Sequence, residues 1–302
     1  MSFLLPTVNT TAVTNISYTS ATTGGEVTND GGAMILDRGI CIGTATNPTI
    51  ANTKITGGNG TGTFVTSLTN LIPGKKFYVR AYATNEQGTQ YGNEINFTVP
   101  ILPADKIIDT DGNIYNTVVI GTQTWMKENL KTTKYGDGTA IPSVTSNSSW
   151  TGLSTPAYCW YDNNSGYKDQ YGAYYNWYSV DAPSNGGKNV CPNGYHVPSD
   201  ADWNILDNQL GGSTIAGTSL KSTTGWCVNG NGTNSSGFNG IPAGARTYDF
   251  GSFVAGCGAT FWTCTPVDSN YVRCIELNYS YGNILHKVNN RRNGYSIRCV
   301  KD

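Results

Sequence analysis

The sequence has 302 residues, only 13% of them charged, and its 19 basic and 20 acidic side chains leave a net charge of −1. Nucleic-acid binding and electrostatic binding to membrane surfaces both need a basic patch, so the composition argues against these two classes of function. No apolar stretch reaches the roughly 18 residues of a membrane-spanning helix, and no span is predicted. A chain of this length is expected to form about two domains.

Residues 1–100 have the pattern of a domain made of short strands. Apolar segments, for example around Ile40, Phe64 and Val79, alternate with turns rich in Gly, Asn and Thr. Strands at this spacing predict an all-β immunoglobulin-like sandwich. The segment from Leu71 to Asn85 resembles the E–F corner of fibronectin type III domains, although Phe77 stands where that family usually has a tyrosine. Such domains commonly act as spacers, so we expect a spacer or attachment role.

A proline-containing linker, residues 101–106, leads to a second domain predicted over residues 107–302. This domain opens with two apolar runs, around Ile108 and Ile120, that are joined through the tight-turn pair Asp111-Gly112. Asp109 and Asp111 could also be calcium ligands, but a calcium loop needs more spaced oxygen donors than this segment supplies. The spacing therefore favours a hairpin turn over a metal site.

Residues 146–190 are rich in tyrosine and tryptophan. Four of the tyrosines follow the i, i+3, i+4, i+7 spacing that places side chains on one face of a helix. They are Tyr171, Tyr174, Tyr175 and Tyr178, and we therefore predict a helix here. Such a stripe is more typical of a buried core than of a carbohydrate-binding platform.

A helix is predicted just after residue 199. Ser199 and Asp202 have the spacing of a capping box, and a Gly-Gly pair at 211–212 ends the apolar pattern. His196 could be a catalytic base, but no Ser or Cys in a nucleophile context lies near it in the sequence, which favours a structural role. Arg246, at the end of the run GFNGIPAGAR, is expected to brace the fold rather than to bind a ligand.

Four motifs of the second domain are similar to motifs of one family. They are DTDGNIYNTVVIGTQTWMKENL from residue 109, CPNGYHVPS from 191, GFNGIPAGAR from 237 and NGYSIRCV from 293. The domain resembles the Fibrobacter succinogenes major paralogous (FISUMP) family and the C-type-lectin-like variable proteins of diversity-generating retroelements. The resemblance implies a fibronectin type III-like sandwich followed by an α+β C-type-lectin-like domain, with residues 257–302 as a variable C-terminal region.

The eight cysteines form no CxxC pair, which argues against zinc-ribbon and thioredoxin-type sites. In C-type-lectin-like folds a disulfide often joins a cysteine ahead of a helix to one in the last strand. The resemblance therefore implies a bridge between Cys191 and Cys299. From the residues alone, both could equally be small buried side chains.

The C-terminal region combines a strand scaffold with side chains suited to binding. Ile275, Leu277 and Ile297 stand at strand-like spacing and are expected to be buried. Side chains between them and in the loops are expected to converge on one exposed face, because Tyr and Asn provide rigid contact area and adaptable hydrogen bonds. The predicted ligand-binding residues are Cys264, Pro266, Val267, Tyr271, Val272, Cys274, Tyr279, Tyr281, Leu285, His286, Val288 and Arg291.

We interpret the chain as a non-catalytic binding protein, an adhesin or a phage receptor-binding fibre protein, that needs no cofactor and no metal ion. The enzyme alternative on the same fold is a formylglycine-generating type, which would use Cys264 and Cys274 as a thiol pair. A three-histidine iron site is excluded because His196 and His286 are the only histidines. A bacterial cell-surface structural protein is a further alternative.

The expected partners are a protein or glycan receptor on a cell surface and, through the N-terminal domain, other virion or surface proteins. A homo-oligomer is compatible with the sequence, whereas nucleic acid is not an expected partner. The start, MSFLLPTVNTT, lacks the basic segment of a secretory signal. We therefore expect an extracellular location on a virion, with a bacterial cell surface as the alternative.

Overall fold

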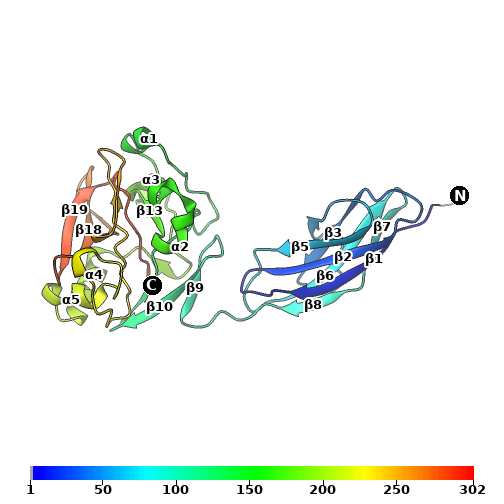
Figure 1. The fold of residues 1–302 in the computed structure, drawn as a ribbon, viewed down its shortest axis with the longest axis horizontal. Helices are drawn as coiled ribbons and strands as arrows, with labels where there is room; N and C mark the ends of the chain where they lie inside the picture. Colours follow the sequence, from blue (N-terminus) through cyan, green and yellow to red (C-terminus); the bar gives the residue numbers. More distant parts are fainter. Residues whose placement is uncertain (1–2) are drawn as a thin grey trace. The chain divides into compact units, whose positions relative to one another are not determined.

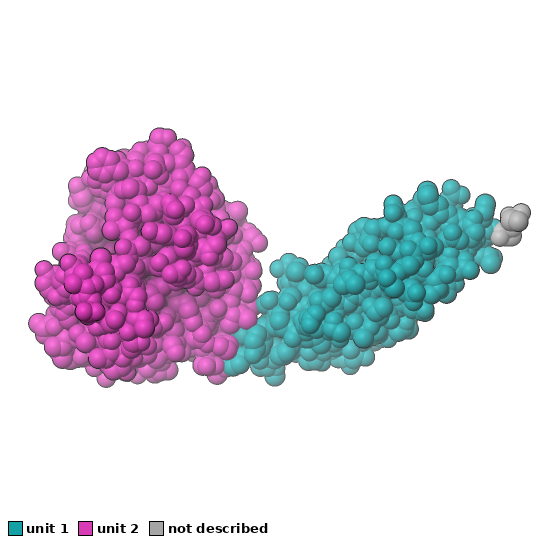
Figure 2. Space-filling view, viewed as in Figure 1, with its two compact units in different colours: residues 1–103 teal, residues 104–302 magenta. Residues whose placement is uncertain are grey.

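The computed structural model describes residues 3–302 and divides into two compact units, Met1–Pro103 and Ala104–Asp302 (Figure 2). Unit 1 has one hydrophobic core, and the buried apolar residues of unit 2 form three clusters. Within the described residues, no helix combines the length and the apolar character needed to cross a membrane.

Unit 1 is a β-sandwich of two antiparallel sheets (Figure 1). In β6, Phe77, Val79 and Ala81 are buried at every second position, because successive side chains of a strand point to opposite faces. One sheet has the order β1-β2-β5 and the other β4-β3-β6-β7, with β8 also paired to β6. The two sheets enclose one hydrophobic core, as expected for a sandwich. The strands are β1 Thr7–Thr14, β2 Ala21–Asn29, β3 Asp37–Gly43, β4 Thr53–Thr56, β5 Gly62–Leu68, β6 Lys76–Asn85, β7 Gly88–Tyr91 and β8 Ile95–Thr98.

Unit 2 contains a five-stranded sheet that joins its first strands to its last. The strand order is β14-β20-β11-β10-β9, and Trp125 of β11 lies opposite Val300 of β20. The first and last strands of this domain therefore lie together in one sheet. The strands are β9 Lys106–Ile108, β10 Ile114–Ile120, β11 Gln123–Met126, β14 Tyr195–His196 and β20 Val300–Lys301.

A second, three-stranded antiparallel sheet of unit 2 has the order β17-β18-β19. The two sheets are accompanied by two-stranded pairs, β12 with β13 and β15 with β16. These strands are β12 Tyr158–Trp160, β13 Ala173–Tyr175, β15 Ala245–Arg246, β16 Phe253–Val254, β17 Gly258–Pro266, β18 Tyr271–Asn278 and β19 Ile284–Asn290.

The helices of unit 2 are short, and α4 is the longest. The backbone N–H of Asp202 donates to the Ser199 hydroxyl, and the Asp202 carboxylate accepts the N–H of Ser199, so the predicted capping box is confirmed. Figure 1 shows α4 and α5 beside β18 and β19, which they contact. The helices are α1 Asn147–Thr151, α2 Lys168–Tyr171, α3 Ala182–Asn185, α4 Asp200–Gln209 and α5 Ser213–Leu220, with 3-10 turns at Tyr161–Asn163, Ser165–Tyr167, Trp177–Ser179 and Cys227–Asn229.

The prediction of one tyrosine-lined helix is wrong. Helix α2 ends at Tyr171 because Gly172 has a φ of +75°, and the chain then enters β13. A Cβ atom at position 172 would lie only 2.7 Å from the Cβ of Asn129, so the close approach requires glycine. Tyr174 and Tyr175 are fully buried in β13, whereas Tyr171 remains half-buried.

Both faces of the β17-β18-β19 sheet are covered. Directly opposed residues of antiparallel strands share a face. On one face Phe261 opposes Ile275, and both belong to a cluster that includes Trp203 of α4. On the other face Trp262 opposes Cys274, and both belong to the cluster around Tyr295. The sheet is therefore an internal layer that is exposed only at its rims and connecting loops.

Candidate ligand-binding surface

Exposed apolar side chains gather where β17 is joined to β18. Val267 is 49% exposed, Tyr271 44% and Val288, on the neighbouring strand, 47%. Tyr271 opposes Asn290 and Arg273 opposes Val288, which places all four on one face of the sheet. Diagonal neighbours of this kind are about 7–8 Å apart, within reach of a tyrosine ring. We call Val267, Tyr271, Arg273 and Val288 the hairpin rim. Pro266 is also exposed, but it opposes Val272 and so lies on the other face of the sheet.

Hydrogen bonds fix the loop that carries the hairpin rim. The Asp268 carboxylate accepts the backbone N–H groups of Asn270 and Tyr271 at 2.7 and 2.8 Å. The Arg291 guanidinium donates to the Asp268 carbonyl at 2.6 Å, and the N–H of Val267 donates to the Tyr271 carbonyl. A loop held in this way loses little entropy when it binds, so the hairpin rim is pre-organised.

Val272 and Cys274 do not belong to any surface, and their assignment as ligand-binding residues is wrong. Both are fully buried, because the face of β18 that they occupy packs against the cluster around Tyr295. Asn289 donates to the Cys274 sulfur, and burial raises the pKa of this thiol to about 12. Alternation correctly placed them on the face opposite Ile275, but that face is not exposed.

Tyr279 and Tyr281 lie at the other end of β18 from Tyr271. This strand has eight residues, which corresponds to about 25 Å. Tyr281 is 56% exposed, and its backbone carbonyl accepts a hydrogen bond from Lys221. Half-buried Leu285, opposite Glu276, lies toward the same end. These side chains cannot share one compact contact area with the hairpin rim.

His286 is held against α4 rather than displayed. Its Nδ1 lies 2.8 Å from Asp200 Oδ1, and its Nε2 lies 3.7 Å from Asp207 Oδ2. Burial raises the pKa of Asp207, although the neighbouring His286 acts in the opposite direction. The histidine thus connects β19 to two carboxylates of α4 and has a packing role.

Cys264 and Arg291 lie on the opposite side of the sheet from Tyr271. The Arg291 guanidinium stacks on Trp177, with its Cζ 4.4 Å from the ring centroid, and Trp177 belongs to the cluster that covers that side. Exposed Cys264 lines a hollow of about 220 Å³ together with His196. The twelve predicted residues therefore do not converge on one face; Val267, Tyr271 and Val288 remain as the coherent group.

Two disulfides stabilise unit 2. Cys191 and Cys299 are joined, with their Cα atoms 6.0 Å apart, which ties the segment before α4 to the residue just ahead of β20. A second disulfide joins Cys227 to Cys257. Sequence reasoning missed it, because no motif or spacing rule pairs these two positions.

Arg246, considered as a ligand-binding residue, and Asp109, considered as a calcium ligand, both make contacts that stabilise the fold. The fully buried Arg246 guanidinium donates to the carbonyls of Val144, Thr145 and Gly251, so it braces loops. Asp109 accepts the backbone N–H groups of Asp111 and Asn113, as expected for a turn. Within residues 3–302, no group of three or more His, Cys, Asp or Glu side chains is placed to hold a metal ion.

His196 forms a contact with the C-terminal residue. Its Nδ1 lies 2.7 Å from the Asp302 carboxylate, and its Nε2 lies 3.4 Å from the carboxylate of Asp202 in the capping box. These contacts link β14 to the chain terminus and to α4. They agree with the structural role expected for this histidine.

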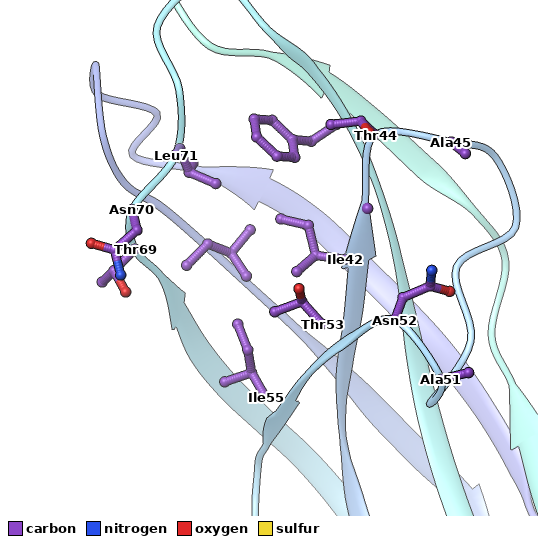
Figure 3. Close-up of a pocket in the computed structure, with 13 residues that line it drawn as sticks. Ile42, Thr44, Ala45, Ala51, Asn52, Thr53, Ile55, Thr69, Asn70 and Leu71 are labelled. Atoms are coloured by element: carbon purple, nitrogen blue, oxygen red, sulfur yellow. The ribbon is translucent and has the colours of Figure 1, made fainter. Parts of the chain in front are cut away.

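A larger hollow, of about 840 Å³, lies in unit 1. Ile42, Ile55 and Leu71 point into it from β3, β4 and the segment after β5 (Figure 3). Its polar lining consists of threonine and asparagine, without a titratable side chain, so the lining offers no acid–base chemistry. Because Ile42, Leu71 and Phe77 also belong to the core, the hollow is an open part of the sandwich interior.

Comparisons with known proteins give one family match and several similar solved structures. The model of a family described as the Fibrobacter succinogenes major domain matches residues 118–301, more than half of the chain. No curated protein matches the chain. A solved sensor domain of the anti-sigma factor RsgI4 from Pseudobacteroides cellulosolvens is 15% identical over 33% of this chain and 100% of its own, with a TM-score of 0.26. The sixth fibronectin type III domain of human fibronectin type III domain containing protein 3 is 18% identical. The match covers 34% of this chain and 94% of that domain, with a TM-score of 0.28.

Proposed function

The chain belongs to the Fibrobacter succinogenes major domain family, and from that premise we propose that it is a non-catalytic protein that binds a cell-surface receptor through the hairpin rim. The proposal rests on the exposure of Val267, Tyr271 and Val288 together at the edge of a sheet whose faces are otherwise covered. Clusters of large exposed apolar side chains on a soluble domain commonly mark interaction sites.

Tyr271 is the expected anchor of the interface. A tyrosine provides a large rigid contact area and a polar hydroxyl, and residues of this kind often dominate binding energy. The Arg273 guanidinium, beside Val288, is 43% exposed, and its Nε lies 3.7 Å from Asp200. Its remaining N–H groups are available to a carboxylate or carbonyl of the receptor.

The enzyme alternative requires Cys264 and Cys274 to act in one site. Cys264 is exposed and its N–H donates to the Pro198 carbonyl, whereas Cys274 is fully buried beside Asn289. These different surroundings do not support a shared thiol site. They favour binding over catalysis as the function of this region.

We further propose that the chain acts outside a cell, as an adhesin or a fibre protein of a virion, and that unit 2 has a C-type-lectin-like fold. The sandwich of unit 1 would then serve as a spacer that connects unit 2 to other surface or virion proteins. The hollow in unit 1, whose lining lacks titratable side chains, agrees with a spacer rather than a catalytic domain.

Binding of the labelled protein to a panel of bacterial isolates, measured by flow cytometry, tests the proposal. We expect the combined change Val267→Ser, Tyr271→Ala and Val288→Ser to weaken binding about tenfold or more. Val65→Ser is the matched control, because Val65 is a 77% exposed apolar residue of unit 1. If no isolate binds the protein, or if the triple variant binds as well as the control, the proposal is wrong.

A further inference from the structure

A cluster of half-buried tyrosines lies in unit 2 among residues that the hairpin rim does not include. The Tyr161 ring centroid is 5.2 Å from that of Tyr167 and 5.1 Å from that of Tyr171, and the last two are 5.8 Å apart. All three side chains retain solvent-accessible surface. They come from consecutive short elements, two 3-10 turns and α2. We call Tyr161, Tyr167 and Tyr171 the tyrosine platform.

The tyrosine platform packs against two further aromatic rings. Tyr161 also contacts Phe253 at 5.6 Å and Tyr174 at 6.5 Å between ring centroids, and Tyr174 is fully buried. The rings are therefore supported from below and form a surface before any ligand arrives. The adjoining backbone is unusual, because Asp162 and Asn163 have φ values of 50° and 52°. Left-handed non-glycine residues of this kind concentrate at functional sites.

A small polar pocket adjoins the tyrosine platform at Tyr171. It has a volume of about 120 Å³, and its lining includes Lys131, Asp169, Gln170 and Asn239. The Lys131 ammonium lies 2.6 Å from the Asp169 carboxylate. The pocket thus offers hydrogen-bond donors and acceptors side by side. A hydroxyl group, which can donate and accept at once, matches such a lining.

We propose that the tyrosine platform and the adjoining pocket form a saccharide-binding site. A pyranose ring carries C–H groups on its faces, which pack against a tyrosine ring, and hydroxyl groups on its edges. An apolar ligand would leave the polar groups of the pocket without partners at a desolvation cost. A peptide could cover the rings, but it lacks the dense row of hydroxyls that this lining suits. The site is separate from the hairpin rim, so its occupancy does not depend on the proposed function.

Retention of the purified full-length protein on insoluble cellulose, chitin, xylan and mannan tests this inference. We expect retention on at least one of these polysaccharides. Tyr167→Ala and Tyr171→Ala should each weaken the binding of the matching soluble oligosaccharide about tenfold, as measured by titration calorimetry. Tyr167→Phe, which keeps the ring, should bind within about threefold of the unchanged protein, because stacking rather than the phenol carries the contact.

Two control substitutions distinguish this site from tyrosines elsewhere on the protein surface. Tyr18→Ala removes a half-buried tyrosine of unit 1, and Tyr271→Ala removes the anchor of the hairpin rim; neither should change oligosaccharide binding. Melting curves identify any variant that fails to fold, in which case Tyr167→Gln replaces Tyr167→Ala. Absence of retention on all four polysaccharides overturns the inference. Retention on cellulose, xylan or mannan that survives periodate oxidation of the sugar diols, as binding to residual protein would, also overturns it, as does unchanged binding in both alanine variants.

Discussion

At the scale of single residues, Asp207 of α4 is a buried carboxylate whose charged form is disfavoured by its surroundings. Its Oδ1 has no hydrogen-bond partner within residues 3–302, and burial raises its pKa despite His286 Nε2 at 3.7 Å from Oδ2. A raised pKa in the folded state means that the folded protein binds this proton more tightly than the unfolded chain does. The contribution of Asp207 to stability is therefore largest in acid and decreases as the pH rises above about 4.

We predict that Asp207→Asn increases the free energy of unfolding at about pH 7 and changes it little at about pH 3, since asparagine imitates the protonated acid. Urea unfolding followed at both values of pH measures the difference. If Asp207→Asn is instead less stable than the unchanged protein at pH 7, the prediction is wrong. The ionised carboxylate would then stabilise the fold through His286.

The residues of the hairpin rim illustrate what sequence patterns can and cannot locate. Val267 and Tyr271 are found by pattern, because they flank a polar loop between two strands. Val272 and Cys274 were misplaced, because strand alternation assigns a side chain to one of two faces but does not reveal whether that face is covered. Here the covering layer comes from residues such as Trp177 and Tyr295, which are distant from β18 in the sequence.

At the scale of elements, the N-terminus of α4 depends on its capping box. Ser199 and Asp202 exchange side-chain and backbone hydrogen bonds, which satisfy N–H groups that the helix leaves free. We predict that Ser199→Ala lowers the free energy of unfolding by about 0.5–2 kcal/mol in urea titrations. The exposed Ser154→Ala is the control and should change it by less than about 0.5 kcal/mol. Equal effects of the two substitutions would contradict a role for the cap.

Local signals of this kind explain which elements could be predicted. The sandwich strands and α4 were predicted because their periodicity and capping residues agree with the tertiary structure. The tyrosine-lined helix was not, because its helical spacing is interrupted by Gly172, whose positive φ and contact with Asn129 are set by neighbouring segments. The tyrosine platform was missed for the same reason, since Tyr161, Tyr167 and Tyr171 come together only after the chain turns.

At the scale of the whole molecule, the residues that form the core of unit 2 are distinct from those that the hairpin rim exposes. Its five-stranded sheet joins the beginning and end of the unit, the Cys191–Cys299 disulfide ties the segment before α4 to the end, and its three-stranded sheet is covered on both faces. The hairpin rim can therefore vary in side-chain chemistry without disturbing the core. The family resemblance predicts a variable region at residues 257–302, and the three-dimensional packing determines which of its residues are accessible.

The adjacent residues Tyr271 and Val272 test this separation most directly, because one is displayed and the other is fully buried. The measurement is the binding of Tyr271→Ala to the bacterial isolates that retain the unchanged protein, with the free energy of unfolding determined on the same samples. We predict that binding falls about tenfold or more while stability changes by less than about 0.5 kcal/mol. Val272→Ala should do the reverse and lose about 1–3 kcal/mol of stability, because its deletion leaves a cavity. Full binding by Tyr271→Ala, or a loss of its stability comparable to that of Val272→Ala, would contradict the claim that the hairpin rim is a display surface.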